Sequence, residues 1–132
     1  MQLQIKKVKR DSIYYQIFKR FPSLLFEIIE KHPEAEKKYR FESIEVKETA
    51  FRFDGVFLPP ENSKPQIVFF LEVQFQPDEF LYYRFLTESM MYLHRNRGKF
   101  DDCYYVVIFP SRSLEPSDTN IYRFFINSDQ LQ

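Results

Sequence analysis

The sequence contains little cysteine, histidine or glycine. It has one cysteine, two histidines and two glycines among its 132 residues. The single thiol, Cys103, cannot form a disulfide within the chain, which is typical of proteins from the reducing cytoplasm. One cysteine and two histidines also exclude a zinc motif. We therefore expect a cytoplasmic protein with no internal disulfide and no zinc site.

The sequence also lacks an excess of one charge and a long apolar run. Nineteen lysines and arginines balance nineteen aspartates and glutamates. Attraction to nucleic acid must therefore come from local basic clusters rather than from net charge. The N-terminal segment MQLQIKKVKR lacks the apolar core of a signal peptide, and no run approaches transmembrane length. These absences predict a soluble protein with no membrane partner.

Aromatic residues, by contrast, are abundant. The chain has 16 phenylalanines and nine tyrosines. Disordered chains contain few aromatic residues, so we expect this chain to fold. A chain of 132 residues is long enough for one core. We expect one domain spanning residues 1–132.

Hydrophobic patterns predict the order helix, three strands, helix, strand. A first helix capped by Asp11 or Ser12 precedes a second that begins at Pro22 and ends near His32 and Pro33. A charged connection, 34–38, follows it. The remaining predicted elements are strands at 43–48, 50–58 and 67–75, a helix at 79–97 capped by Asp78 and closed by Gly98, a strand at 104–109, and a strand-like run at 120–126.

Two predicted strands each carry one acid, Asp54 in the first and Glu72 in the second. An acid in an apolar strand is costly unless a partner compensates it. If the two runs form a hairpin, paired residue numbers sum to about 125, which places Asp54 opposite Leu71 or Glu72. Opposed Cβ atoms are ~4.5–5.5 Å apart, close enough for two carboxylates to share a divalent cation.

The alternation of side chains supports this pairing. One face of the second strand is apolar throughout, whereas the other changes from apolar to polar at Glu72 and Gln74. The alternative is that Asp54 and Gly55 form a turn and that Glu72 is a solvated strand residue. The phrase Arg-Phe-Asp-Gly-Val-Phe favours a strand with a bulge at Gly55.

The motif DGVFLPP…FFLEVQFQPDEFLYYRFLTESMMYL resembles the PD-(D/E)XK nuclease superfamily. It is most similar to the recombination-promoting nuclease and transposase-like group, in a branch common in cyanobacterial genomes. The resemblance extends over nearly the whole chain, from DSIYYQIFKRFPSLLFEII to IYRFFINSDQLQ. It implies a restriction-endonuclease-like α/β fold, with an αβββαβ core and a mixed central sheet flanked by helices. Members usually continue with more helix after such an ending, so the resemblance implies truncation at the C-terminus.

The resemblance also implies a site for Mg²⁺ or Mn²⁺. Its ligands would be Asp54, Glu72 and the backbone carbonyl of Val73, and Gln74 occupies the position of the usual catalytic lysine. A glutamine can orient a water molecule, but it brings no positive charge. Hard oxygen ligands suit Mg²⁺, which would activate the water and the scissile phosphate.

The long helix offers one further catalytic candidate. Arg84 shares a helical face with Glu88, with Met91 or Tyr92, and with Arg95. We expect Arg84 to lie beside the second strand and contact phosphate. The alternative is an intrahelical ion pair between Arg84 and Glu88, worth only a few tenths of a kcal/mol.

Additional residues are weaker candidates. Glu27 resembles an acid that some superfamily members add to the metal site, although a solvated helix face is the favoured explanation. Tyr92 is expected near Arg84. Two basic clusters are candidates for binding the nucleic-acid backbone, and both would make binding salt-dependent. They are Lys6, Lys7, Lys9 and Arg10 at the N-terminus, and Arg95 and Arg97 with His94 and Lys99 at the helix end. The second cluster also complements the helix dipole.

These features predict a metal-dependent endonuclease that hydrolyses double-stranded DNA, linked to mobile elements or recombination and able to form a homodimer. A first alternative is a catalytically degenerate nuclease fold that binds nucleic acid or protein, which Gln74 and the short C-terminus favour. A second is a structural or interaction protein whose aromatic residues form an oligomer interface.

Overall fold

The computed structural model describes residues 13–43, 45–46, 51–52, 55–116 and 126–132. Residues 13–20 are helical. The other helices are η1 (Pro22–Leu24), α2 (Leu25–Ile28), η2 (Glu36–Lys38), α3 (Leu81–Arg95) and η3 (Arg112–Leu114). The strands are β1 (Arg40–Glu42), β2 (Glu45–Val46), β3 (Phe51–Arg52), β4 (Gly55–Leu58), β5 (Ile67–Val73) and β6 (Asp102–Ile108).

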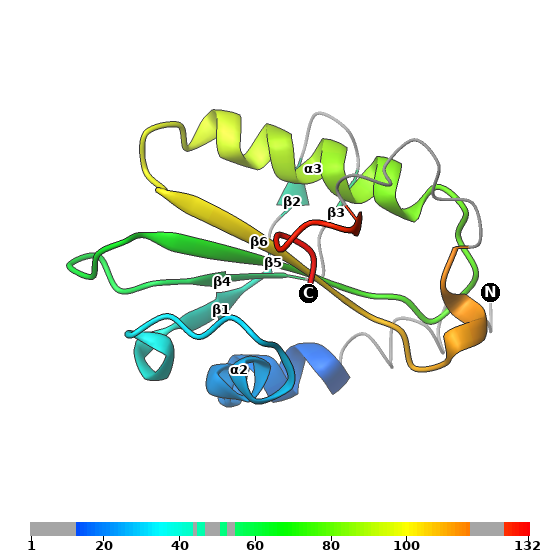
Figure 1. Cartoon of the computed structure of the whole chain (residues 1–132), viewed down its shortest axis with the longest axis horizontal. Coiled ribbons are helices and arrows are strands. Elements are labelled where there is room, and N and C mark those ends of the chain that lie inside the picture. Colours follow the sequence, from blue (N-terminus) through cyan, green and yellow to red (C-terminus); the bar gives the residue numbers. More distant parts are fainter. Residues whose placement is uncertain (1–12, 44, 47–50, 53–54, 117–125) are drawn as a thin grey trace.

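A four-stranded mixed sheet with the order β1-β4-β5-β6 forms the centre of the fold. β1 pairs with β4 and β4 with β5 in antiparallel fashion, whereas β5 and β6 are parallel. A parallel pair needs a crossover connection, and α3 provides it (Figure 1). The chain therefore has the predicted α/β fold, in which β1, β4 and β5 are neighbouring antiparallel strands and β6 follows α3.

Helices cover both faces of this sheet (Figure 1). The N-terminal helices pack on one face through Phe18, Leu25 and Phe26, against Phe57, Phe69 and Leu71. On the other face, α3 packs through Tyr82, Phe85 and Tyr92 against Val56, Val68 and Phe70. The alternation along β5 is confirmed, because its odd-numbered residues face the N-terminal helices and Val68 and Phe70 face α3.

The register of β4 and β5 is close to the predicted one. Gly55 pairs with Leu71 and Phe57 with Phe69, so paired numbers sum to 126 rather than about 125. The prediction of one strand over 50–58 was wrong in its extent. Phe51 and Arg52 belong to β3, which pairs with β2 in a separate two-stranded sheet, and β4 begins at Gly55.

Strand β1 was not predicted from the sequence. It has only three residues, Arg40, Phe41 and Glu42, and only Phe41 points into the core. A single apolar residue between two charged ones gives no alternating pattern long enough to recognise. Within the predicted strand 43–48, Glu45 and Val46 form β2, and residues 44, 47 and 48 lie outside the described residues.

The helices begin and end differently from the prediction. α3 begins at Leu81 rather than at 79, because Asp78 Oδ1 accepts a hydrogen bond from the Phe80 N–H (2.9 Å) in a turn that precedes the helix. It ends at Arg95, and Gly98 follows with a φ of 83°, the left-handed conformation expected of a closing glycine. α2 ends at Ile28, because Ile29 is already extended.

Two predictions fall where the structure gives little information. The capping residues Asp11 and Ser12 lie outside the described residues, and so does the run 120–126 except for Ile126. In the part of the chain that is described, no helix has both the length and the apolar character to cross a membrane.

Candidate functional site

The buried carboxylate of Glu72 is the centre of the candidate site. Glu72 lies one residue before the end of β5, and only 6% of its surface is exposed. Its neighbours Leu71 and Val73 face the N-terminal helices, so the side chain of Glu72 faces α3. The alternative of a solvated strand residue is therefore wrong, and a buried carboxylate requires compensation.

Arg84 in the first turn of α3 provides that compensation. Its Nη2 lies 2.9 Å from Oε1 of Glu72 and donates a hydrogen bond to it. The expectation that Arg84 lies beside the second predicted strand is confirmed. Charge-assisted bonds of this kind are stronger than neutral ones, so the contact fixes the start of α3 against the end of β5.

Two more acids surround the same guanidinium. Arg84 Nη2 lies 3.4 Å from Asp78 Oδ2, and Nη1 lies 3.6 Å from Glu88 Oε1. Glu88 is fully buried, at 0% exposure. The intrahelical pair of Arg84 and Glu88 is thus present together with the contact to Glu72. Three carboxylates, from β5, from the loop before α3 and from α3, meet at one arginine.

The three acids favour the charged form of the arginine. Burial alone would lower the pKa of Arg84, but the charges of Glu72, Glu88 and Asp78 and the hydrogen bond that Arg84 donates to Glu72 outweigh it and raise that pKa. Arg84 is therefore a permanent cation, as arginines in proteins are. The site therefore contains the fixed positive charge of Arg84 surrounded by three acids, Glu72, Asp78 and Glu88.

Val73 and Gln74 complete the end of β5. Val73 pairs with Ile108 of β6, and the Gln74 N–H donates to the Ile108 carbonyl at 2.9 Å. The side chain of Gln74 is buried at 5% exposure and donates from Nε2 to the carbonyl of Gln76. Its amide is thus held at the strand end, two residues from Glu72.

Asp54, the other predicted metal ligand, lies outside the described residues. Its neighbour Gly55 pairs with Leu71, the neighbour of Glu72. Glu42 of β1 lies at the same end of the sheet, because it pairs with Val56.

Sequence reasoning predicted Asp78 only as a cap and Glu88 only as a helical pair. The pair of Arg84 and Glu88 was predicted, whereas the contact of Asp78 with Arg84 was missed. The spacing of Arg84 and Glu88 was a usable signal, whereas nothing in the periodicity connects Asp78 with a residue six positions later.

Tyr92 and Glu27 lie on opposite faces of the sheet, Tyr92 on α3 and Glu27 on α2. Tyr92 lies two turns after Arg84 and packs against Phe70 and Phe100, and burial together with Glu42 raises its pKa. Glu27 is exposed on α2, which covers the face of the sheet opposite to Glu72.

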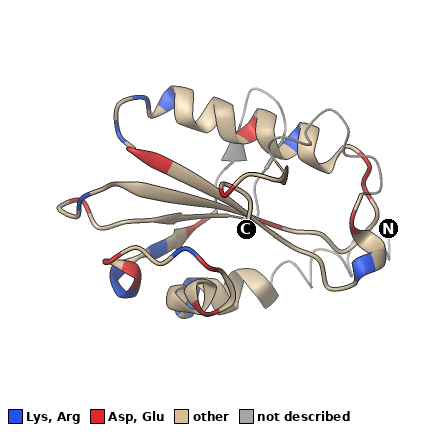
Figure 2. Cartoon of the chain, in the orientation of Figure 1, with Lys and Arg blue, Asp and Glu red and all other residues tan. Residues whose placement is uncertain are grey.

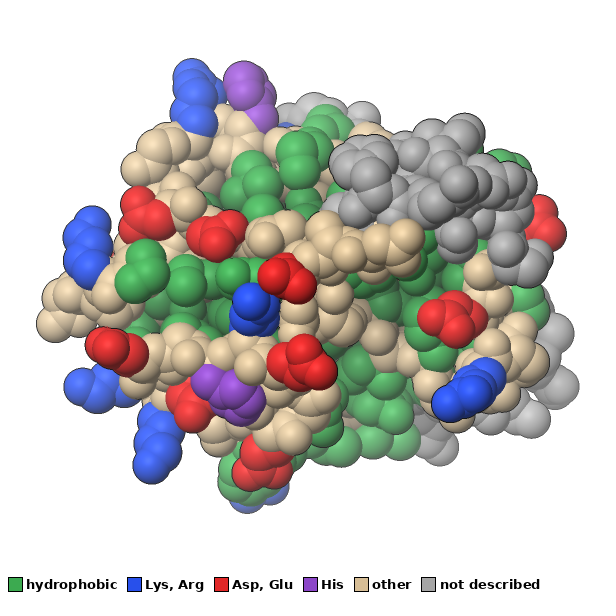
Figure 3. Space-filling model, in the orientation of Figure 1, with side chains coloured by type: hydrophobic (Ala, Val, Ile, Leu, Met, Phe, Trp, Pro, Cys, Tyr) green, Lys and Arg blue, Asp and Glu red, His purple; other side chains and the backbone are tan. Residues whose placement is uncertain are grey.

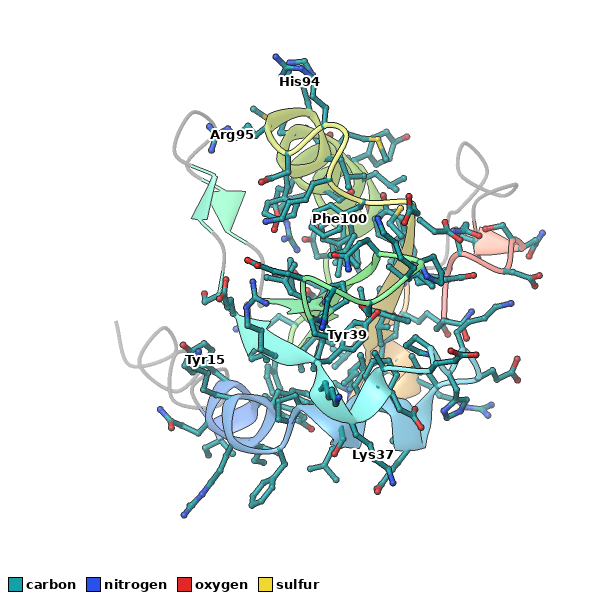
Figure 4. The ribbon with its side chains drawn as sticks, turned by 90° about the vertical axis from the view of Figure 1, so that its left-hand side faces the viewer. Tyr15, Lys37, Tyr39, His94, Arg95 and Phe100 are labelled. Atoms are coloured by element: carbon teal, nitrogen blue, oxygen red, sulfur yellow. The ribbon has the colours of Figure 1, made fainter. Side chains whose placement is uncertain are left out.

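The basic clusters lie away from Glu72 where the structure describes them. Arg95 and Arg97 are exposed at the end of α3, roughly 16 Å of helical rise beyond Arg84. Figure 4 shows His94 and Arg95 at this outer end. Lys6, Lys7, Lys9 and Arg10 lie outside the described residues. Acidic and basic side chains are interspersed over the visible surface rather than gathered by sign (Figures 2 and 3).

A groove of about 830 Å³ lies at the other end of β5. Residues of η2, the β4–β5 loop and the start of β5 line it, including Lys37, Tyr39 and Ile67 (Figure 4). Ile67 and Glu72 are five residues apart, roughly 17 Å along a strand. None of the predicted site residues that the structure describes lines this groove, and its lysines and glutamates give it no single charge. The site at Glu72 is the better candidate on chemical grounds.

The side-chain oxygens around Glu72 are of the type that binds a hard divalent cation. The side chains of Glu72, Asp78 and Glu88 offer only carboxylate oxygens, which Mg²⁺ and Mn²⁺ prefer. Among the described residues, no group of three or more histidines, cysteines, aspartates or glutamates has a metal-binding arrangement. Mg²⁺ is commonly held by one or two carboxylates with retained waters, so Glu72 and one further acid would be enough.

Comparison with known proteins identifies one family. A family model described as "Protein of unknown function (DUF2887)" matches residues 10–132. No curated protein and no solved structure matches the chain significantly.

Proposed function

The chain belongs to the DUF2887 family, and we propose that it is a metal-dependent endonuclease of the PD-(D/E)XK type that hydrolyses DNA. The observation that carries the proposal is the buried Glu72 at the end of a central strand, paired with the permanent cation Arg84. A buried acid is costly. A buried acid paired with a residue whose pKa is perturbed is a candidate for a functional site.

The second ligand in this proposal is Asp54. The register observed between β4 and β5 pairs Gly55 with Leu71. Asp54 itself lies outside the described residues, and the hairpin pattern of the sequence predicts that it lies opposite Leu71 or Glu72. Directly opposed Cβ atoms are ~4.5–5.5 Å apart, so the two carboxylates would bind one cation.

Each residue of the site has a role in phosphodiester hydrolysis. When bound, Mg²⁺ or Mn²⁺ supplies Lewis-acid activation of the phosphate and lowers the pKa of a water. Asp54, Glu72 and the Val73 carbonyl hold the cation. Arg84 contacts the phosphate, and Gln74 orients the water through its amide.

Several broader features remain part of the proposal. They are a double-stranded DNA substrate, a homodimer that cuts both strands, a link to mobile elements or recombination, and a cytoplasmic location. The α/β fold with Glu72 at the strand end is compatible with each of them.

A specific observation favours a second candidate function, a degenerate nuclease fold that only binds nucleic acid or protein. The Gln74 amide donates a hydrogen bond to the Gln76 carbonyl. The amide that is expected to orient the water is therefore already bound to the backbone. The lysine that this position usually carries would supply a charge that glutamine lacks. Cleavage distinguishes the two candidates.

The test is cleavage of supercoiled plasmid with Mg²⁺ or Mn²⁺, in the wild type and in Glu72→Gln purified in parallel. We expect nicked and linear products from the wild type, none with a chelator, and at least a hundredfold slower cleavage by the variant, roughly the loss seen when a transition-state contact is removed. Glu61→Gln, an exposed glutamate in the β4–β5 loop, is the matched control and should cleave at the wild-type rate.

Equal cleavage by the wild type and Glu72→Gln would indicate a contaminating nuclease and overturn the role of Glu72. Binding of the plasmid by a folded wild type that never cleaves it would favour the degenerate binding module.

A further inference from the structure

Arg84 and a divalent cation need the same carboxylate. Arg84 Nη2 lies 2.9 Å from Glu72 Oε1, a separation at which a guanidinium offsets much of the negative charge that attracts a cation. Arginine does not lose its proton in proteins. Arg84 therefore cannot release Glu72 by losing its charge, and its side chain must move away from the carboxylate.

The site gives Arg84 somewhere to move. Asp78 Oδ2 and Glu88 Oε1 lie 3.4 and 3.6 Å from its terminal nitrogens, longer than the contact with Glu72. Separating a buried ion pair is costly because it leaves an uncompensated charge. A small shift of Arg84 toward Asp78 and Glu88 avoids this cost, because the guanidinium stays between two carboxylates.

Asp78 is held in place by a contact that does not involve Arg84, and Glu88 is buried beside the guanidinium. Asp78 Oδ1 accepts a hydrogen bond from the Phe80 N–H, which leaves Oδ2 directed at the guanidinium. Glu88 is fully buried one turn along α3. The acceptors for a displaced Arg84 are therefore already in position.

We propose that Arg84 is an internal competitor for the divalent cation at Glu72, held by Asp78 and Glu88 so that it can release Glu72 without leaving the site. This inference rests on the proposed function, since it requires Glu72 to bind a cation. Cation binding displaces Arg84 from Glu72 toward these two acids. A phosphate group that attracts Arg84 has the same effect, so by linkage cation and nucleic-acid backbone strengthen each other's binding.

The opposite role for Arg84 predicts the opposite result. If Arg84 instead orients Glu72 for the cation, removing its side chain weakens cation binding. If Arg84 competes, removing its charge strengthens cation binding even though catalysis is lost. The sign of the change in cation affinity separates the two roles.

The experiment measures Mn²⁺ affinity without nucleic acid, from the paramagnetic resonance signal of free Mn²⁺. We expect Arg84→Gln to bind Mn²⁺ at least about tenfold more tightly than the wild type, because one nearby positive charge is removed. Arg20→Gln is the control with the same charge change at an exposed position of the helix 13–20. It should stay within about twofold of the wild type, since distant surface charges are screened. Circular dichroism confirms that each variant is folded.

Unchanged or weaker Mn²⁺ binding by Arg84→Gln, with binding lost in Glu72→Gln, would overturn the competition and leave the cation site intact. Absence of Mn²⁺ binding in both the wild type and Arg84→Gln would overturn the proposed metal site and this inference together.

If Arg84→Gln does not fold, Asp78→Asn provides the test. An asparagine retains the oxygen that accepts from the Phe80 N–H but loses the charge that attracts Arg84 away from Glu72. Weaker Mn²⁺ binding by Asp78→Asn is the expected result, and equal or tighter binding would overturn the inference.

Discussion

At the scale of single residues, Glu72, Arg84 and Glu88 show how a charge can be buried in an apolar fold. Glu72 and Glu88 are both nearly or fully buried, and both face the same guanidinium. Removing one partner of a buried ion pair typically costs ~3–5 kcal/mol. The arginine therefore has a structural role whatever chemistry the site performs, and variants that keep the shape of the side chain are the informative ones.

Sequence reasoning could reach part of this cluster. Parity along β5 places Glu72 opposite to the core-facing residues, and helical spacing places Arg84 and Glu88 on one face. The contact of Asp78 with Arg84 could not be predicted, because it depends on how the loop enters α3.

Buried tyrosines predict an alkaline limit to stability. Burial, assisted by the charge of Glu115, raises the pKa of Tyr82 to about 12, and burial also raises the pKa of Tyr39 and Tyr105. The folded protein then holds these phenol protons more tightly than the unfolded chain does. Their contribution to stability is complete below pH ~10 and is lost as the pH rises toward 12.

We expect the free energy of unfolding in urea to fall above pH 10, by up to about 1.4 kcal/mol per pH unit for each such tyrosine. Tyr82→Phe should show a shallower fall, because phenylalanine does not titrate. An equally steep fall in the wild type and in Tyr82→Phe would contradict the assignment to Tyr82.

At the scale of elements, the prediction from sequence was least accurate at the start of β4. The pattern of 50–58 predicted one strand, yet β3 and β4 belong to different sheets. Period-two alternation indicates that a segment is extended, but it does not identify its partner strand. Parity was correct within β5 because successive side chains of a strand alternate between its two faces wherever the strand is regular.

Packing explains why a glycine occupies position 55, in addition to the preference of glycine for turns. A Cβ atom added to Gly55 would lie 2.1 Å from Cε2 and Cζ of Phe41, and Phe41 is a fully buried ring of β1. The ring occupies the space that any larger residue needs.

We expect Gly55→Ala to lower the free energy of unfolding by ~1–3 kcal/mol, the usual cost of overpacking a core, with a lower Tm in a thermal melt. Gly98→Ala is the comparison, since a Cβ there meets nothing within 4 Å and only the φ of 83° opposes it. A smaller loss for Gly55→Ala than for Gly98→Ala would contradict the packing explanation.

At the scale of the whole molecule, the fold brings the ends of several elements to one end of the sheet. β5 ends there, β4 begins there, and α3 begins above them (Figure 1). The α/β class and the helix–strand order followed from hydrophobic pattern and resemblance. The second sheet of β2 and β3 and the strand β1 did not, because two- and three-residue strands carry too little pattern.

The central claim is that Asp54 and Glu72 act at one cation-dependent site. The most direct measurement is the single-turnover rate of DNA cleavage in Mg²⁺ by the wild type, Asp54→Asn, Glu72→Gln and the double variant. Residues that act as a unit are strongly non-additive, so each single substitution should slow cleavage at least about a hundredfold and the double variant should be no slower than the slower single one. Losses that multiply in the double variant, or a folded wild type with no Mg²⁺-dependent cleavage, would contradict the account.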